Sequence, residues 1–217
     1  MSILKNLSAV KKKIEETKLI VVTKNRSVRE INQAIFLGVK DIGENKVQEA
    51  KQKKSLVKKR INWHFIGHLQ RNKVKDAVKL FDLIHSVDSY RLARKIDSVA
   101  KFENKKMAVL VQVNISEEKQ KFGLSEEEVI PLIKKLINLK NLKVLGLMAI
   151  APFVSAEETR PYFRRMKKLF EKCKKADLYP AEMKYLSLGM SNDYEVAKQE
   201  GANMLRVGRI IFENKKN

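Results

Sequence analysis

The sequence of 217 residues contains a single cysteine and no long hydrophobic run. Cys173 alone cannot form an intrachain disulfide, which excludes a disulfide framework and fits a reducing compartment. The longest apolar run, VLGLMAIA, is far shorter than the roughly 20 residues of a membrane-spanning helix. The N-terminal apolar residues recur at helical spacing, so the contiguous apolar block of a secretory signal is also missing. We therefore expect a cytoplasmic protein that does not associate with membranes.

Acidic residues are scarce relative to basic ones, with 25 Asp and Glu against 46 Lys and Arg and a net charge of +21. A nucleic-acid-binding surface would gather the basic residues on one face, often with stacking aromatic side chains between them. Here the basic residues are scattered along nearly every amphipathic segment. We interpret the charge as a solvated, lysine-rich surface, and specific nucleic-acid binding is the less favoured alternative.

Short apolar runs alternate along the chain with longer amphipathic segments, and the runs predict strands at residues 19–24, 41–45, 62–68, 83–87, 107–114, 142–151, 184–190 and 204–208. The runs lack polar alternation, which is typical of parallel strands that are covered on both faces. Eight strand–helix units predict an α/β fold, a single (β/α)₈ barrel of the TIM type over residues 1–217, with an extra N-terminal helix at 3–16. The alternative is an open doubly wound sheet, which the count of eight and the absence of a Gly-rich turn after the first strand disfavour.

Three Ser–x–x–Glu pairs have the spacing of capping boxes and predict helix starts, at Ser27 with Glu30, Ser125 with Glu128, and Ser155 with Glu158. TIM-type barrels place their functional sites at the C-terminal ends of the strands, so the polar residues there become candidates. Two stretches, SLGMSND (187–193) and RVG (206–208), follow the seventh and eighth strands, where such barrels frequently bind phosphate. Small residues and a helix start with free N–H groups suit a phosphate. Each stretch alone is equally compatible with an ordinary turn and cap.

Lys24 follows the first strand, on the same face as Ile20 and Val22 if residues alternate along it. If that face points inward, partial desolvation at the barrel mouth favours the neutral amine, which can form a Schiff base with an aldehyde. With a phosphate site opposite, this arrangement suggests pyridoxal 5′-phosphate. Two alternatives remain open at this point, namely a lysine that pairs with a sugar-phosphate substrate and an ordinary surface lysine.

The sequence resembles the pyridoxal phosphate homeostasis proteins, the alanine racemase-like barrels of the YggS/PROSC type. The most specific stretches are WHFIGHLQRNK and LSLGMSND, and the resemblance runs in order through VTK, IGENKVQE, KFG, GLMAIAP and RVGRIIF. It therefore covers nearly the whole chain. The chain departs from the family pattern after Lys24, at Asn25 and Arg26, and after IF, where Glu213 replaces a common glycine.

The resemblance implies a set of cofactor-binding residues. It implies that pyridoxal 5′-phosphate forms an aldimine with Lys24, that Ser191 and the backbone of Gly208 hold the phosphate, and that Arg206 faces the pyridine nitrogen. It implies that Asn45 and Met148 line the cofactor, with Ser187 as a weaker candidate. His64 and His68 lie four residues apart with no cysteine or carboxylate cluster beside them, so we predict no metal site there. We expect both to be hydrogen-bonded packing residues near the barrel mouth, with Trp63 on the opposite face.

The resemblance implies a non-catalytic protein that carries, buffers or delivers pyridoxal phosphate, with apoenzymes that need this cofactor as possible partners. The alternative is a pyridoxal-dependent racemase, and a basic nucleic-acid binder is a third hypothesis. A racemase needs an acid–base group on each face of the substrate. Barrel racemases take the second group from near an additional domain, whereas only about ten residues follow Gly208, too few for a domain of about 50 residues. We therefore expect a binding protein and no efficient catalysis.

Overall fold

The computed structural model describes residues 3–118 and 120–213, in which eight parallel strands form a closed barrel, with β1 next to β8. The strands are β1 Lys18–Val22, β2 Asp41–Glu44, β3 Asn62–Phe65, β4 Leu83–Val87, β5 Met107–Val113, β6 Leu142–Ala149, β7 Tyr185–Ser187 and β8 Met204–Val207. All neighbouring pairs are parallel and follow the order of the chain. The predicted (β/α)₈ barrel is confirmed, and the open doubly wound sheet is excluded.

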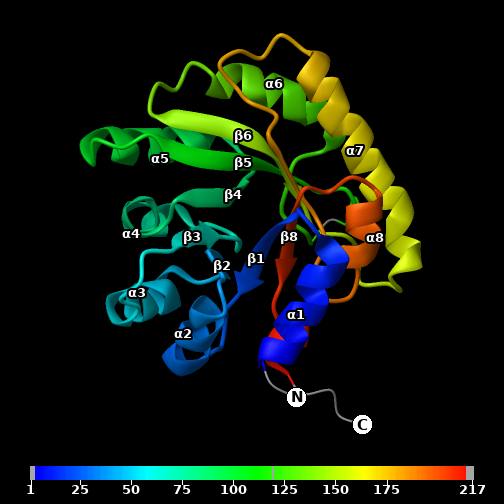
Figure 1. The fold of residues 1–217 in the computed structure, drawn as a ribbon. Helices are drawn as coiled ribbons and strands as arrows, with labels where there is room; N and C mark the ends of the chain where they lie inside the picture. The colour runs from blue at the N-terminus through cyan, green and yellow to red at the C-terminus, as the bar shows by residue number, and fades with distance from the viewer. Residues whose placement is uncertain (1–2, 119, 214–217) are drawn as a thin grey trace.

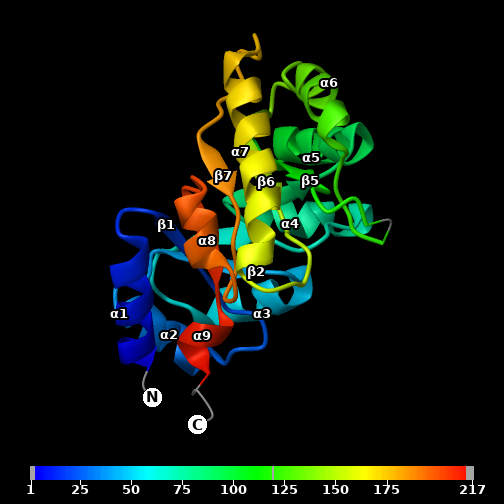
Figure 2. The same ribbon diagram turned by 90° about the vertical axis from the view of Figure 1, so that its right-hand side faces the viewer.

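Helices surround the strands, as Figure 1 shows. They are α1 Ile3–Ile14, α2 Val28–Phe36, α3 Val47–Leu56, α4 Val74–Leu80, α5 Tyr90–Phe102, α6 Glu126–Leu136, α7 Arg160–Lys175, α8 Tyr194–Gln199 and α9 Arg209–Phe212, with 3₁₀ turns η1 Arg71–Lys73 and η2 Glu157–Thr159. Helix α1 is the predicted additional helix before the barrel, and it packs against α9 at the other end of the described chain (Figure 2). None of the described helices is both long enough and apolar enough to cross a membrane.

Successive residues of a strand belong to different hydrophobic clusters, so the strands are buried on both faces. Ile20 belongs to a small cluster with residues of β4, β5, β6 and β8, which can meet only inside the barrel. Its neighbour Val21 belongs to the large cluster between the strands and the helices. Trp63 of β3 lies in this outer cluster, on the face opposite to His64, as expected. The apolar runs of the sequence thus reflect two cores, one on each side of the strand ring.

Two of the three predicted capping boxes start helices. Ser27 and Ser125 exchange hydrogen bonds with Glu30 and Glu128 at the starts of α2 and α6. At the third, the Ser155 N–H donates to Glu158 at 2.9 Å, but η2 follows and α7 begins only at Arg160. The 3₁₀ turn η2 occupies the residues between Ser155 and α7, and α7 starts later, with a proline in its first turn, a position that proline favours.

Candidate functional site

The C-terminal ends of β1, β2 and β8 lie side by side and bring several predicted site residues to one edge of the barrel. Val22 pairs with Gly43, and Val21 pairs with both Ile42 and Val207. Lys24 lies two residues beyond β1, Asn45 one residue beyond β2, and Gly208 one residue beyond β8. The strand register therefore places these residues at the same end of the barrel, as the sequence predicts.

The side chain of Lys24 is exposed to solvent. This contradicts the expectation that the barrel mouth partly desolvates it, because β1 ends at Val22 and the lysine lies in the following turn. Within residues 3–118 and 120–213, no hydrogen bond or ion pair joins its ammonium to another residue. Its amine is thus accessible and chemically free to react with a carbonyl compound.

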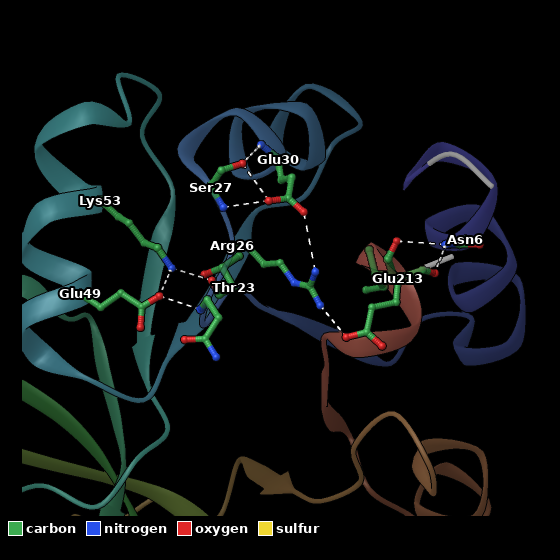
Figure 3. A network of polar contacts seen from close by, with 10 residues as sticks. Asn6, Thr23, Arg26, Ser27, Glu30, Glu49, Lys53 and Glu213 are labelled. Atoms are coloured by element: carbon green, nitrogen blue, oxygen red, sulfur yellow. Dashed lines mark hydrogen bonds and ion pairs between the residues drawn. The ribbon is translucent and has the colours of Figure 1, made fainter. Parts of the chain in front are cut away.

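The turn that carries Lys24 is itself held firmly. Thr23 is fully buried, its N–H donates to the carbonyl of Gly43 at 3.0 Å, and its carbonyl accepts the N–H of Arg26 at 3.0 Å. Figure 3 shows that Lys53 of α3 also reaches the Thr23 carbonyl. An exposed lysine side chain therefore projects from a hydrogen-bonded backbone.

Arg26 and Glu213, two positions noted above as departures from the family that the chain resembles, contact each other. The Arg26 guanidinium lies 2.8 Å from a carboxylate oxygen of Glu213 and stands over the ring of Phe212, 5.3 Å from its centroid. The backbone carbonyl of Glu213 accepts a hydrogen bond from Asn6 of α1 (Figure 3). The two departures together form one contact between the Lys24 turn and the end of α9.

Ser191 and Gly208 lie together beside the end of β1. The Gly208 N–H donates to the Ser191 hydroxyl at 3.3 Å. A Cβ atom at Gly208 would lie 2.7 Å from the carbonyl oxygen of Val22 and 2.9 Å from its Cβ, so only glycine fits this close approach. The two groups predicted to hold a phosphate thus lie within hydrogen-bonding distance of each other.

At the start of α8, two backbone N–H groups already have an acceptor within the preceding loop. The helix begins at Tyr194, and the N–H groups of Asp193 and Tyr194 both donate to the carbonyl of Met190. The Met190 N–H donates in turn to the Asp193 carboxylate at 2.6 Å. These two N–H groups are not available to a phosphate, whereas the N–H groups of Glu195 and Val196, in the first turn of α8, have no acceptor among the described residues.

Arg206 is buried inside the barrel near the end of β8, with only 3% of its surface exposed. One terminal nitrogen donates to the Ser187 hydroxyl at 2.6 Å and the other to the carbonyl of Ala149 at 2.9 Å. Burial lowers the pKa of Arg206 to about 10, so the guanidinium stays charged at neutral pH. Two acceptors fix its plane and leave it as a rigid cationic donor.

A chain of buried hydrogen bonds runs from Arg206 through the interior of the barrel to its opposite end. The Ser187 hydroxyl lies 3.1 Å from Nδ1 of His85, and Nε2 of His85 lies 3.0 Å from Nδ1 of His64. Nε2 of His64 lies 2.8 Å from a carboxylate oxygen of Asp41, the first residue of β2. Lys18, at the start of β1, lies 2.8 Å from the same oxygen. Members of six strands therefore join in one network.

The chemistry of the end groups assigns the protons along this chain. Arg206 can only donate, so Ser187 accepts from it and donates its own proton to His85. Burial, and then electrostatic interactions with His64 and Arg206, place the pKa of His85 well below its usual range. A neutral His85 that accepts at Nδ1 carries its proton on Nε2, and it donates that proton to His64. His64 then donates from Nε2 to Asp41.

Asp41 ends the chain as a carboxylate. Burial alone would raise the pKa of Asp41, but hydrogen bonds from His64 and Lys18 outweigh burial and lower it to about 2. The direction of donation is therefore the same at every step, from a fixed cation to a fixed anion.

The sequence did not single out His85 or Asp41. His85 lies in the run LIHSV, and a histidine inside an apolar strand was the available signal. His64 is hydrogen-bonded as expected, but its bond to the start of β2 places it deep in the barrel rather than near the mouth. His68 lies beyond β3, where its ring stacks on Phe122 at 3.6 Å between centroids. In the part of the chain that the structure describes, no group of three or more His, Cys, Asp or Glu could hold a metal ion.

Three buried polar atoms near the strand ends lack a hydrogen-bond partner among the described residues, namely Oε2 of Glu44, Oδ1 of Asn45 and the hydroxyl of Ser86. Unpaired buried polar atoms are rare and commonly mark a site that a bound molecule completes. Met148, fully buried near the end of β6, belongs to the interior cluster. The free amine of Lys24, the close approach at Gly208 and these orphan atoms together fit a small phosphorylated aldehyde.

Comparisons with known proteins agree with this geometry. Residues 1–215 match the family described as alanine racemase, N-terminal domain. The chain is 39% identical over 201 residues to the "Pyridoxal phosphate homeostasis protein" of Aquifex aeolicus, covering 92% of this chain and 87% of that protein. It is 37% identical over 204 residues to the protein of the same name from Escherichia coli, covering 91% and 86%.

Solved structures show the same relationship. PipY of Synechococcus elongatus, determined with pyridoxal phosphate bound, superposes with a TM-score of 0.90 at 31% identity, over 98% of this chain and 100% of that one. An alanine racemase of Clostridium difficile shares the fold at 17% identity, with a TM-score of 0.77, and this chain spans 57% of its length. The fold is that of the alanine racemase barrel domain. Within that class, the chain belongs to the pyridoxal phosphate homeostasis protein family.

Proposed function

We propose that this protein binds pyridoxal 5′-phosphate reversibly and carries, buffers or delivers it to enzymes that require it, without efficient catalysis of its own. The observation that carries the proposal is a free, exposed lysine amine at the same barrel edge as a small-residue cradle of Ser191 and Gly208. The names of the relatives and the PipY structure support it. The single cysteine fits a cytoplasmic location for this role.

Each predicted residue has a part in holding the cofactor. The Lys24 amine would condense with the aldehyde to form a Schiff base, with release of one water molecule. Ser191 and the Gly208 N–H would bind the phosphate, and Arg206 would donate to the pyridine nitrogen. Asn45 and Met148 would line the ring. Ser187 lies between Arg206 and His85, so we propose that it acts through Arg206 rather than on the cofactor.

The geometry favours holding the cofactor over using it. When bound, pyridoxal phosphate supplies an electron sink for carbanions, and this sink is strongest when its pyridine nitrogen is protonated. A charged Arg206 beside that nitrogen would disfavour its protonation and so lower reactivity, without excluding catalysis. The exposed Lys24 would also leave a covalent bond to the cofactor open to water, which would permit exchange and work against carbanion chemistry. A racemase-like enzyme remains the second candidate because its fold is shared.

Borohydride reduction followed by peptide mass mapping tests the covalent link. Incubation with pyridoxal phosphate and reduction should place a pyridoxyl group on Lys24. The Lys24→Met variant should lose the adduct, whereas Lys12→Met, which removes an exposed lysine of α1, should keep it. An adduct on another residue, or none, would refute the assignment.

Cofactor transfer separates the carrier from the enzyme. Loaded protein mixed with a pyridoxal-dependent apoenzyme should restore that enzyme's activity, while the protein alone should not racemise alanine or other amino acids measurably. Racemisation at about 1–1,000 turnovers per second, the ordinary range of enzymes, would instead identify a racemase.

A further inference from the structure

Lys53 of α3 is a buried lysine whose ammonium contacts the turn that carries Lys24. Its side chain is 8% exposed, and its Nζ lies 2.6 Å from the Thr23 carbonyl oxygen, 2.8 Å from Oε1 of Glu44 and 2.5 Å from Oε1 of Glu49. An ammonium has three protons to donate, and these three acceptors satisfy all of them. Lys53 therefore has one defined position, unlike the surface lysines of this chain.

Glu44 and Glu49 connect Lys53 to the residues on both sides of Lys24. Glu44, whose side chain is fully buried, accepts a second hydrogen bond from the Thr23 hydroxyl at 2.6 Å. Glu49 accepts the backbone N–H of Asn25 at 2.6 Å. The residues immediately before and after Lys24 are thus both tied to Lys53, directly or through one carboxylate (Figure 3).

We infer that Lys53 is a positioning residue, which holds the Lys24 turn so that the Lys24 amine faces the cofactor. The inference rests on the proposed function and assigns a role to a residue outside the cofactor contacts. Lys53 would act through the backbone of Thr23 and through Glu49, and it would not touch the cofactor itself.

The backbone conformation explains why the turn needs support. Asn25 has φ +59°, a left-handed conformation that residues other than glycine rarely adopt and that is kept only where the surroundings fix it. The hydrogen bond from its N–H to Glu49 is formed in this conformation. A buried charge cluster adds little stability compared with apolar packing, but it can specify a single geometry. Geometric definition is what a reacting amine requires.

Loss of Lys53 would also leave the two carboxylates without their cation. Glu49, which accepts the Asn25 N–H, would lose its ionic partner, and the fully buried Glu44, whose pKa is already raised by burial, would favour its neutral form. The contacts on both sides of Lys24 would then change. The outer contact between Arg26 and Glu213 cannot replace this support, because Glu213 is about half exposed and surface ion pairs contribute little.

Two probes separate positioning from general damage. Pyridoxal 5′-phosphate reports covalent bond formation by absorbance and by borohydride trapping, whereas pyridoxine 5′-phosphate carries an alcohol in place of the aldehyde and reports only non-covalent binding. In Lys53→Met, the rate of adduct formation on Lys24 should fall about 10- to 100-fold, the range expected for a misplaced reacting group. The Kd of pyridoxine 5′-phosphate should stay within about twofold of wild type. The matched control is Lys51→Met, which removes an exposed lysine of the same helix and should behave as wild type.

An unchanged adduct rate in Lys53→Met would overturn the inference, and so would equal weakening of both probes. If Lys53→Met does not fold, Glu49→Ala replaces it, because Glu49 is only partly buried; the same two criteria then apply. Hydrogen exchange of the Asn25 amide in cofactor-free protein gives an independent test. It should accelerate in Lys53→Met and not in Lys51→Met, even if wild-type Lys24 forms no adduct. A failure of the proposed function is thereby distinguished from a failure of the positioning role.

Discussion

Replacing Ser187 with alanine tests the chain of hydrogen bonds between Arg206 and Asp41. The Ser187 hydroxyl accepts from Arg206 at 2.6 Å and lies 3.1 Å from His85. All three residues are buried, so neither partner can turn to water when the hydroxyl is lost. Ser187→Ala therefore leaves a guanidinium N–H and an imidazole nitrogen unpaired inside the barrel.

The expected loss follows from the two orphaned groups. An unsatisfied buried donor or acceptor costs about 1–3 kcal/mol, so the free energy of unfolding should fall by roughly 2–6 kcal/mol. Loss of one hydroxyl creates almost no cavity, so packing contributes little. Ser86→Ala is the matched control, since this fully buried serine lies on β4 and its hydroxyl has no partner among the described residues. Its removal should leave stability unchanged or raise it.

Urea unfolding of the cofactor-free proteins, followed by fluorescence and circular dichroism, measures both effects. Ser187→Ala should lower the transition midpoint at an unchanged slope, and Ser86→Ala should not. The reasoning is refuted if the two variants lose the same stability, or if Ser187→Ala costs less than about 0.5 kcal/mol, the usual size of a neutral substitution. A loss seen only in the cofactor-loaded protein would instead assign Ser187 to the cofactor.

Two further predictions concern the ends of the site. Ser191→Ala should weaken pyridoxal phosphate binding by about 1.5–3 kcal/mol, roughly tenfold or more; equal weakening for unphosphorylated pyridoxal in equilibrium titrations would contradict a phosphate contact. Asp41→Asn should lose about 2 kcal/mol of stability at pH 7, because the pKa of Asp41 is lowered from 3.8 to about 2. A lowered folded-state pKa gives stability that is present above about pH 4 and lost as the pH falls towards 2. The difference in free energy of unfolding between wild type and Asp41→Asn, measured with urea, should therefore shrink as the pH falls from about 4 towards 2. A difference that stays constant would contradict a lowered pKa of Asp41.

The barrel could be predicted from the sequence because its strands are short, apolar and regularly spaced. Strands that are covered on both faces lack alternating polar residues, so apolar runs such as 107–114 stand out from the amphipathic helices. Strand ends were less well predicted, since turns can continue an apolar pattern. The run 62–68 is a strand only to Phe65, and Lys24 lies in a turn rather than in β1.

The residues at the strand ends could be predicted because the barrel fold itself specifies where they meet. The interior network could not, because its members contribute through contacts that local sequence does not encode. His85 and Ser187 are separated by 102 positions along the chain and meet only when the barrel closes. Lys53 was equally hidden, since it is one lysine among many in a strongly basic chain and only its burial distinguishes it.

The polarity of the interior chain bears on the choice between carrier and enzyme. A carboxylate hydrogen-bonded at the pyridine nitrogen would stabilise its proton and strengthen the electron sink. Along this chain the negative charge of Asp41 is separated from Arg206 by Ser187 and two histidines, of which His85 is neutral, so the guanidinium keeps its charge and its role as donor. Every hydrogen bond also runs in the same direction, and reversing one would leave a buried group unpaired. The network therefore fixes Arg206 in a state that could donate to a pyridine nitrogen and would not promote its protonation, which supports the proposed role in holding the cofactor without excluding a racemase.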